Sequence, residues 1–63
     1  MKKGCKIRIL VADDHYIVRM GVIAIINNEP DMEVIAEAAN GMQALEMFGR
    51  HKPDLVLLDS RMP

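Results

Sequence analysis

Three aspartates carry the most specific chemical signal in this sequence of 63 residues. Asp13 and Asp14 directly follow the apolar run 7–12, and Asp59 directly follows the apolar run 55–58. A short, continuous apolar run before a turn is typical of a strand buried on both faces of a parallel sheet. The carboxyl ends of parallel strands share one edge, where such sheets bind ligands. If the two runs form neighbouring strands, the three carboxylates meet at that edge.

Carboxylates that lie close together repel one another, and a divalent cation between them relieves this repulsion. Mg²⁺ is the natural ion, because it takes one or two protein carboxylates, keeps waters and leaves positions for phosphate oxygens. This arrangement suits phosphoryl transfer, with one aspartate as nucleophile or all three as ligands. His15 lies beside the acids, but no second His follows three or four residues later, which argues against a His-based metal site.

Each acid also has an ordinary structural interpretation. An Asp pair after a strand commonly marks the start of a helix, and Asp14 is the expected N-cap. Asp59 taken alone is a turn residue at the end of a strand. The presence of acids at two strand ends that can be neighbours favours the functional interpretation.

The elements that must position these acids alternate along the chain. Strands are predicted at 7–12, 32–38 and 55–59, and helices are predicted at 16–26 and 42–51. Helices of about three turns between short apolar strands imply right-handed crossovers and a parallel sheet of three strands. The predicted fold class is therefore α/β.

Periodicity predicts which side chains of these elements are packed. The apolar stripe of the first helix comprises Val18, Val22, Ile25 and Ile26. Gly21 lies on the same side, where its missing side chain would let the helix approach a strand closely. The apolar face of the second helix comprises Met42, Ala44, Leu45, Met47 and Phe48. In the strand 32–38, Met32, Val34 and Ala36 alternate with two glutamates, although Ile35 and Ala38 blur this pattern. The two glutamates indicate an edge of the sheet.

Length and composition restrict the class of protein. The 63 residues allow one small domain, and a composition of 51% hydrophobic and 27% charged residues argues against disorder. The formal net charge of −1 gives no general attraction for nucleic acid or an anionic membrane, and Lys2, Lys3, Lys6 and Arg8 are interpreted as a solvated tail. The single Cys5 excludes an internal disulfide. No stretch is long enough to span a bilayer, so a cytoplasmic location is expected.

Four stretches in order resemble the receiver domain of two-component response regulators. They are Ile-Leu-Val-Ala-Asp-Asp-His at 9–15, Val-Arg-Met-Gly at 18–21, Glu-Ala-Ala-Asn-Gly-Met-Gln-Ala-Leu at 37–45, and Pro-Asp-Leu-Val-Leu-Leu-Asp-Ser-Arg-Met-Pro at 53–63. The Asp-Asp-His and Glu-Ala-Ala-Asn-Gly segments resemble the NarL/FixJ-type branch, whose regulators usually carry a helix-turn-helix DNA-binding output domain. The resemblance covers nearly all of the chain, but only about the first half of the family's fold.

The resemblance implies a flavodoxin-like (CheY-like) doubly wound parallel sheet, limited here to strand–helix–strand–helix–strand with strand order 2-1-3. It implies that Asp59 accepts phosphate from a sensor histidine kinase and lies at the metal. Asp13 and Asp14 match the acidic pair that binds Mg²⁺, and the backbone carbonyl of Arg61 matches a further ligand. Residues 1–63 would then be the amino-terminal part of a phospho-accepting signalling module rather than an enzyme, and DNA would be bound only through an output domain outside them.

Two other classes of protein fit part of the pattern. A Mg²⁺-dependent aspartyl phosphotransferase or phosphohydrolase uses similar acids, but such enzymes typically have Asp-x-Asp after the first strand, where this chain has adjacent Asp13 and Asp14. A non-catalytic α/β scaffold fragment would need no acids at all. In the strand order 2-1-3 the strand 55–59 is expected to be an unpaired edge. Residues 1–63 are therefore expected either to oligomerise through this strand or through the helix 16–26, or to be the ordered remnant of a longer chain.

Overall fold

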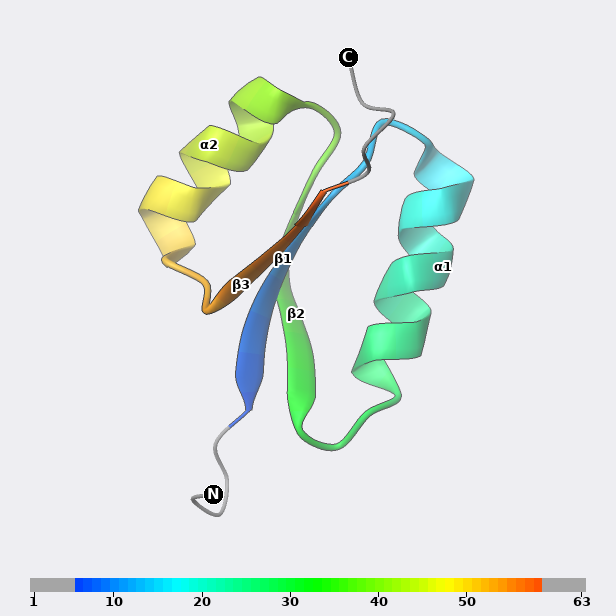
Figure 1. Cartoon of the computed structure of the whole chain (residues 1–63). Coiled ribbons are helices and arrows are strands. Elements are labelled where there is room, and N and C mark those ends of the chain that lie inside the picture. Colours follow the sequence, from blue (N-terminus) through cyan, green and yellow to red (C-terminus); the bar gives the residue numbers. More distant parts are fainter. Residues whose placement is uncertain (1–5, 59–63) are drawn as a thin grey trace.

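The structure is a computed structural model that describes residues 6–58. Its elements are β1 (Ile7–Ala12), α1 (Tyr16–Asn27), β2 (Met32–Ala38), α2 (Gly41–His51) and β3 (Leu55–Leu58) (Figure 1). The three strands are parallel and form one sheet in the order β2-β1-β3. The predicted α/β class, element order and strand order are therefore confirmed.

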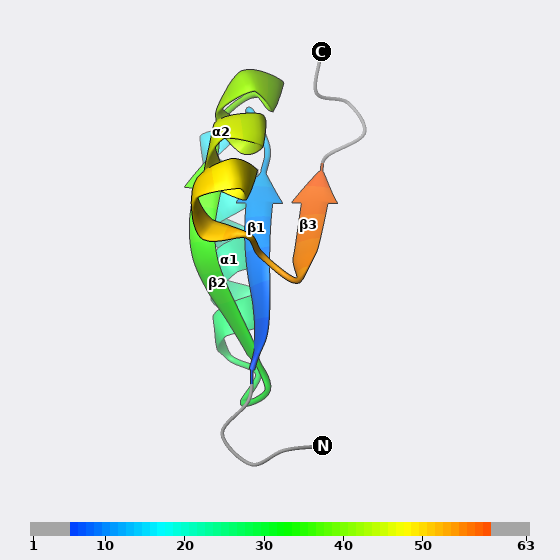
Figure 2. The ribbon, with the colours of Figure 1, turned by 90° about the vertical axis from the view of Figure 1, so that its left-hand side faces the viewer.

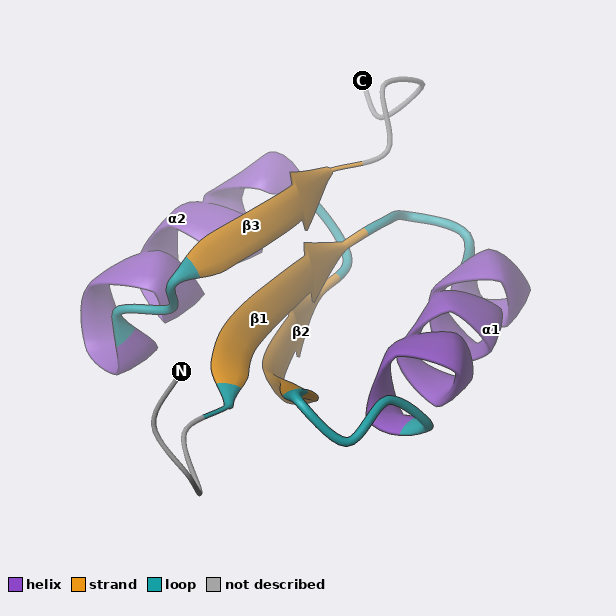
Figure 3. Cartoon of the chain, turned by 60° about the horizontal axis from the view of Figure 1, so that its bottom comes forward, coloured by secondary structure: helices purple, strands orange, loops and turns teal. Residues whose placement is uncertain are grey.

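The two helices cover opposite faces of the sheet, as Figure 3 shows. The chain moves from β1 to β2 in one direction, and then from β2 past β1 to β3 in the other direction. Because crossovers between parallel strands keep one hand, this reversal places α1 and α2 on different faces. Of the helices that residues 6–58 form, neither is long and apolar enough to cross a membrane.

The core is built on both faces of β1. Ile9 and Val11 belong to a cluster on the α1 side, whereas Leu10 and Ala12 belong to a cluster on the α2 side. The α1 side is completed by Val22, Ile23, Ile26, Met32 and Val34, and the α2 side by Ala36, Ala38, Ala44, Met47 and Val56. Successive side chains of a strand point to opposite faces, so a strand covered on both faces needs a continuous apolar run.

β2 contains a β-bulge. The pairing with β1 shifts between Val34 and Ala36, so that Ile35 is an extra residue. Since side chains alternate along a strand, one extra residue moves every later side chain to the opposite face. Met32 and Val34 consequently pack on the α1 side and Ala36 on the α2 side. The prediction that these three share a face is wrong, while the predicted position of β2 at an edge is confirmed.

α1 packs through a face that differs from the predicted stripe. Ile26 is buried, with Val22 and Ile23 beside it in the same cluster, whereas Ile25 is 70% exposed. Gly21 is also exposed, and a Cβ atom added there would meet nothing within 4 Å. The interpretation of Gly21 as a packing glycine is therefore wrong. The helix is rotated so that Ile23, outside the predicted stripe, faces the sheet.

α2 contacts the sheet through a narrow strip. Ala44 is buried and Met47 packs on the same cluster, but Met42, Leu45 and Phe48 are 83%, 75% and 48% exposed. The predicted apolar face is wrong for these three side chains. The partners of Ala44 in β1 and β2 are largely alanines, so the helix can lie close to the sheet and covers only the residues directly beneath it.

Reciprocal hydrogen bonds fix the start of α2. The Oδ1 atom of Asn40 accepts a hydrogen bond from the backbone N–H of Gln43 at 2.8 Å, and the Oε1 atom of Gln43 accepts one from the N–H of Ala39 at 2.8 Å. This arrangement resembles a capping box, which satisfies N–H groups that the first helical turn leaves open. α2 begins at Gly41, one residue before the predicted start.

Arg8 of β1 holds the turn that leads into β3. Its guanidinium donates to the carbonyl oxygens of His51 at 2.7 Å and Lys52 at 2.8 Å. Its backbone N–H donates to the Asp54 carboxylate at 2.9 Å, and its carbonyl accepts from the Asp54 N–H at 2.8 Å. Lys52 ends α2 in the left-handed region, with φ 50° and ψ 62°. Arg8 is thus not part of a solvated tail; residues 1–5 of that predicted tail lie outside the described ones.

β3 is the second edge of the sheet. It pairs only with β1 among the described strands, and both helices lie over β1 and β2 rather than over β3 (Figure 2). Leu55, Leu57 and Leu58 are consequently 45%, 37% and 61% exposed. The predicted unpaired edge is confirmed, and oligomerisation through it stays a prediction.

Candidate functional site

The predicted site lies at the edge of the sheet where its strands end. β1 and β3 are direct neighbours, and Ala12 is paired with Leu58. In the sequence, Asp13 follows Ala12 and Asp59 follows Leu58. This register is the one that the hypothesis of converging carboxylates requires. Asp59 and Arg61 themselves lie outside the described residues, so their roles stay predictions.

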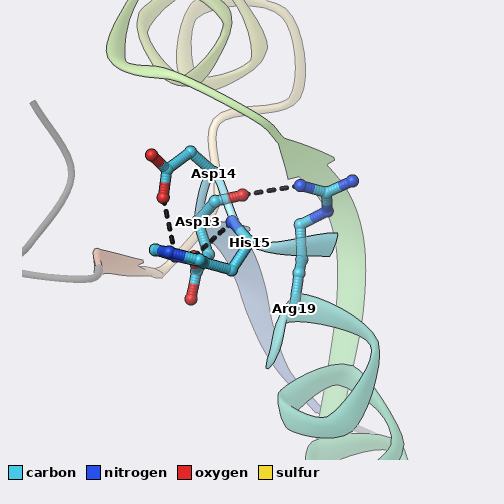
Figure 4. A network of polar contacts seen from close by, with 4 residues as sticks. All are labelled: Asp13, Asp14, His15 and Arg19. Carbon is cyan, nitrogen blue, oxygen red and sulfur yellow. Dashed lines mark hydrogen bonds and ion pairs between the residues drawn. The ribbon is translucent and has the colours of Figure 1, made fainter. Parts of the chain in front are cut away.

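Asp13 is a buried acid at the end of the central strand, with 4% of its surface exposed. Its backbone N–H donates to the carbonyl of Ala38 at 3.0 Å, which continues the pairing with β2 by one residue. Its Oδ1 atom accepts a hydrogen bond from the backbone N–H of His15 at 2.8 Å (Figure 4). An Asp that binds the backbone two residues later forms a turn, which here connects β1 to α1.

The predicted N-cap role of Asp14 is wrong. The N-cap position of α1 belongs to His15, and no side chain makes a cap hydrogen bond there. The Asp14 carboxylate instead lies beside the imidazole, with its Oδ1 atom 2.8 Å from Nδ1 of His15. The same Nδ1 atom lies 3.2 Å from Oδ1 of Asp13, so the ring contacts both acids.

The donors at this edge fit a hard divalent cation. One ligand atom each from Asp13, Asp14 and His15 lies within 4.8 Å of the others. The Asp13 side chain is 6% exposed and that of Asp14 is 35% exposed. A buried carboxylate on one side and a solvent-facing one on the other suit Mg²⁺, which retains part of its water. A carboxylate offers about four acceptor positions, so an ion and His15 can share the two acids.

Sequence reasoning missed Arg19, which binds the peptide group of Asp13 from α1. The NH1 atom of Arg19 donates to the backbone carbonyl of Asp13 at 2.6 Å (Figure 4), and its Nε atom donates to Oε1 of Glu37 at 2.8 Å. The guanidinium also lies 5.6 Å from the centre of the Tyr16 ring. A cation in the first turns of a helix opposes the helix dipole, and this could have indicated a specific partner.

A groove of about 290 Å³ opens between α1 and β3, next to the acids. Its lining comprises Val11, Ala12, Asp13, Val18, Val22, Leu57 and Leu58. Val18, predicted to be packed, borders this groove and is 42% exposed. Asp13 is the polar residue of a mostly apolar wall, so its carboxylate lies where an apolar surface and the solvent meet.

Comparison with known proteins identifies the family. The sequence pattern of the response regulator receiver domain matches residues 9–63. The chain belongs to this family. Receiver domains are the phosphoaccepting signalling domains of two-component response regulators rather than classical enzymes, and they bind Mg²⁺ at an acidic pocket. The predicted family is confirmed, and the acidic group at 13–15 occupies the expected strand end.

Two similar proteins support the NarL-like branch of the family. The oxygen regulatory protein NreC of Staphylococcus epidermidis is 46% identical over 56 residues, which make up 89% of this chain and 26% of NreC. The signal receiver domain of NarL from Mycobacterium tuberculosis superposes with a TM-score of 0.89 and 42% identity, over 94% of this chain and 48% of that one. The predicted similarity to NarL-like regulators and the CheY-like fold are therefore confirmed.

A second similar structure is that of the P1 domain of CheA3 in complex with CheY6 from R. sphaeroides. It has a TM-score of 0.89 and 36% identity, over 95% of this chain and 47% of that one. The chain thus spans about a quarter of NreC and about half of the solved chains.

Proposed function

We propose that Asp59 accepts a phosphoryl group in a Mg²⁺-dependent reaction and that Asp13 and Asp14 supply the metal-binding carboxylates. The observation that carries this proposal is the pairing of Ala12 with Leu58. Asp13, a buried acid, follows Ala12 in the sequence and Asp59 follows Leu58, so this pairing supports a site that the two acids share. The backbone carbonyl of Arg61 is the further ligand in this proposal.

The donor would be the phosphohistidine of a sensor histidine kinase. A carboxylate oxygen of Asp59 forms the new O–P bond while the N–P bond of the phosphohistidine breaks, and the imidazole leaves with the bond's electron pair and takes up a proton. Bound Mg²⁺ supplies charge neutralisation for the phosphoryl oxygens. Asp13 holds its carboxylate at a fixed place, because its backbone and Oδ1 atom are already hydrogen-bonded within the fold.

The rest of the signalling pathway also belongs to the proposal. Residues 1–63 supply the amino-terminal part of the receiver, and a DNA-binding output domain of the NarL type, outside these residues, would act as the transcriptional effector. NreC is named as an oxygen regulatory protein, and this chain spans 26% of it. A cytoplasmic location is part of the same proposal.

The experiment treats the chain with Mg²⁺ and beryllofluoride or acetyl phosphate and records the mass. We expect an adduct on the parent chain and none on Asp59→Asn. A parallel Mg²⁺ titration should lose its response in Asp13→Asn. The matched control is Asp31→Asn, which changes an exposed aspartate in the turn before β2.

Each other outcome contradicts a defined part of the proposal. Mg²⁺ binding without any adduct would mean that the acids hold an ion but that Asp59 accepts no phosphate. The absence of both responses would favour the scaffold alternative. An adduct that persists in Asp59→Asn would assign the phosphoacceptor to another residue.

A further inference from the structure

We propose that Arg19 is a positioning residue for the metal site: held by Glu37, it fixes the peptide group of Asp13 and thereby sets the affinity of that carboxylate for Mg²⁺. The inference rests on the proposed function, because it assigns a role at the same site. Arg19 touches neither the ion position nor a carboxylate of the acidic pair in the described contacts; it acts through the backbone of Asp13.

Three hydrogen bonds of Asp13 are formed with β2, with the turn after β1 and with α1. Its N–H donates to Ala38 of β2 at 3.0 Å, and its Oδ1 accepts from the N–H of His15, before α1, at 2.8 Å. The third contact is the 2.6 Å hydrogen bond from Arg19 of α1 to its carbonyl. The first and third hold the peptide groups on either side of the Asp13 Cα, so together they limit the rotation of the backbone that carries the carboxylate. Arg19 binds the backbone of Asp13 through its side chain, whereas the His15 ring atom Nδ1 lies 3.2 Å from the Asp13 carboxylate atom Oδ1.

The two hydrogen bonds that Arg19 donates require its planar, forked guanidinium group. The Nε atom donates to Glu37 at 2.8 Å while NH1 donates to the Asp13 carbonyl, so one planar group joins the ends of β1 and β2. The Arg19 side chain is 12% exposed, whereas that of Glu37 is 48% exposed. An ion pair with a half-exposed partner stabilises a fold little, so its main effect is to orient the guanidinium. A lysine carries the same charge but lacks the planar fork.

A purely electrostatic role of Arg19 and a positioning role predict changes of Mg²⁺ affinity with opposite signs. A positive charge near a cation site repels the ion, so removing the charge of Arg19 should tighten Mg²⁺ binding. A positioning role predicts weaker binding, since the loss of outer partners that orient a metal ligand typically lowers affinity by about 10-fold or more. The sign of the change therefore distinguishes the two roles.

The experiment is a MgCl₂ titration of the ¹⁵N-labelled chain, followed through the amide NMR shifts of Asp13 and Asp14. The variants are Arg19→Gln and Arg19→Lys. The control is Arg50→Gln, which removes the same charge from an exposed pair with Glu46 on α2. We expect the dissociation constant to rise about 10-fold in both Arg19 variants and to stay at the parent value in the control.

Every other outcome overturns the inference. Tighter binding by Arg19→Gln would assign Arg19 an electrostatic effect, and an unchanged dissociation constant in the folded Gln or Lys variant would show that it does not position Asp13. The titration measures the dissociation constant of the folded molecules, so a loss of folding stability alone leaves this constant unchanged. If Arg19→Gln does not fold, Arg19→Lys decides, because it keeps the charge and the apolar stem. No Mg²⁺ response in the parent chain would instead refute the proposed metal site itself.

Discussion

Replacing Arg8 by methionine should destabilise the fold by detaching the end of α2 from β1. The guanidinium of Arg8 binds the carbonyl oxygens of His51 and Lys52, which the helix itself leaves without partners. Methionine keeps the apolar stem but donates no hydrogen bond. The two backbone hydrogen bonds of Arg8 and Asp54 are retained, so the variant isolates the side-chain contacts.

The expected cost is about 2 kcal/mol. A hydrogen bond to a charged donor contributes about 1.5–3 kcal/mol where it is shielded from solvent. The 2.7 Å bond to His51 is partly buried, whereas the 2.8 Å bond to Lys52 is exposed and contributes less. A folded chain of this size has roughly 3–9 kcal/mol of total stability. The Arg8 side chain thus supplies a considerable share of it.

Urea unfolding followed by circular dichroism measures this cost. With a slope of about 1 kcal/mol per molar urea, typical of small proteins, the midpoint should fall by about 2 M. The matched control is Arg50→Met, which breaks an i,i+4 pair of 3.3 Å with Glu46, both side chains being 61% exposed. That control should cost no more than about 0.5 kcal/mol. Equal shifts of the urea midpoint for the two variants would refute the conclusion that the Arg8 side chain connects the end of α2 to β1.

Four further changes test the packing and the helix ends by the same unfolding measurement. Lys52→Gly should stabilise the fold by about 0.5–1 kcal/mol, because Lys52 has φ 50° and glycine takes this conformation without steric cost; a lower midpoint would contradict this. Leu10→Ala should cost about 2–5 kcal/mol, since Leu10 is 0% exposed among small neighbours that cannot fill the cavity. Leu45→Ala, at 75% exposure, should stay within about 0.5 kcal/mol, and similar costs for both leucines would contradict the packing of α2. Asn40→Ala should cost about 1 kcal/mol and reduce the helical signal, because it removes the side-chain cap of α2; an unchanged midpoint would show that the cap is dispensable.

The sequence determined the elements and their order. The predicted strand bounds 7–12 and 32–38 agree with the structure, and each helix begins and ends within one residue of its prediction. β3 covers 55–58 of the strand predicted at 55–59, whose last residue lies outside the described ones. These features depend on local signals: apolar runs, a change of periodicity, and breakers such as Pro30 and Pro53. The strand order and the family followed from the order and spacing of the four stretches that resemble receiver domains.

Tertiary packing decided which side of each helix faces the sheet. Both helices are apolar over more of their circumference than one sheet face can cover, so periodicity alone did not determine their rotation. Ile23 rather than Ile25 faces the core, and Leu45 lies in solvent. The bulge at Ile35 is a further case, since the pairing with β1 moves Ala36 to the α2 side.

At the candidate site, too, the sequence determined some features and the tertiary structure decided others. The sequence by itself placed Asp13 and Asp14 at the end of a buried strand, because strand ends and turns are local features and parallel strands share one edge. The contact of Arg19 with the Asp13 carbonyl was decided only by the tertiary structure. Arg19 lies only six residues after Asp13, but the distance between its guanidinium and the Asp13 carbonyl is fixed only once α1 packs on the sheet.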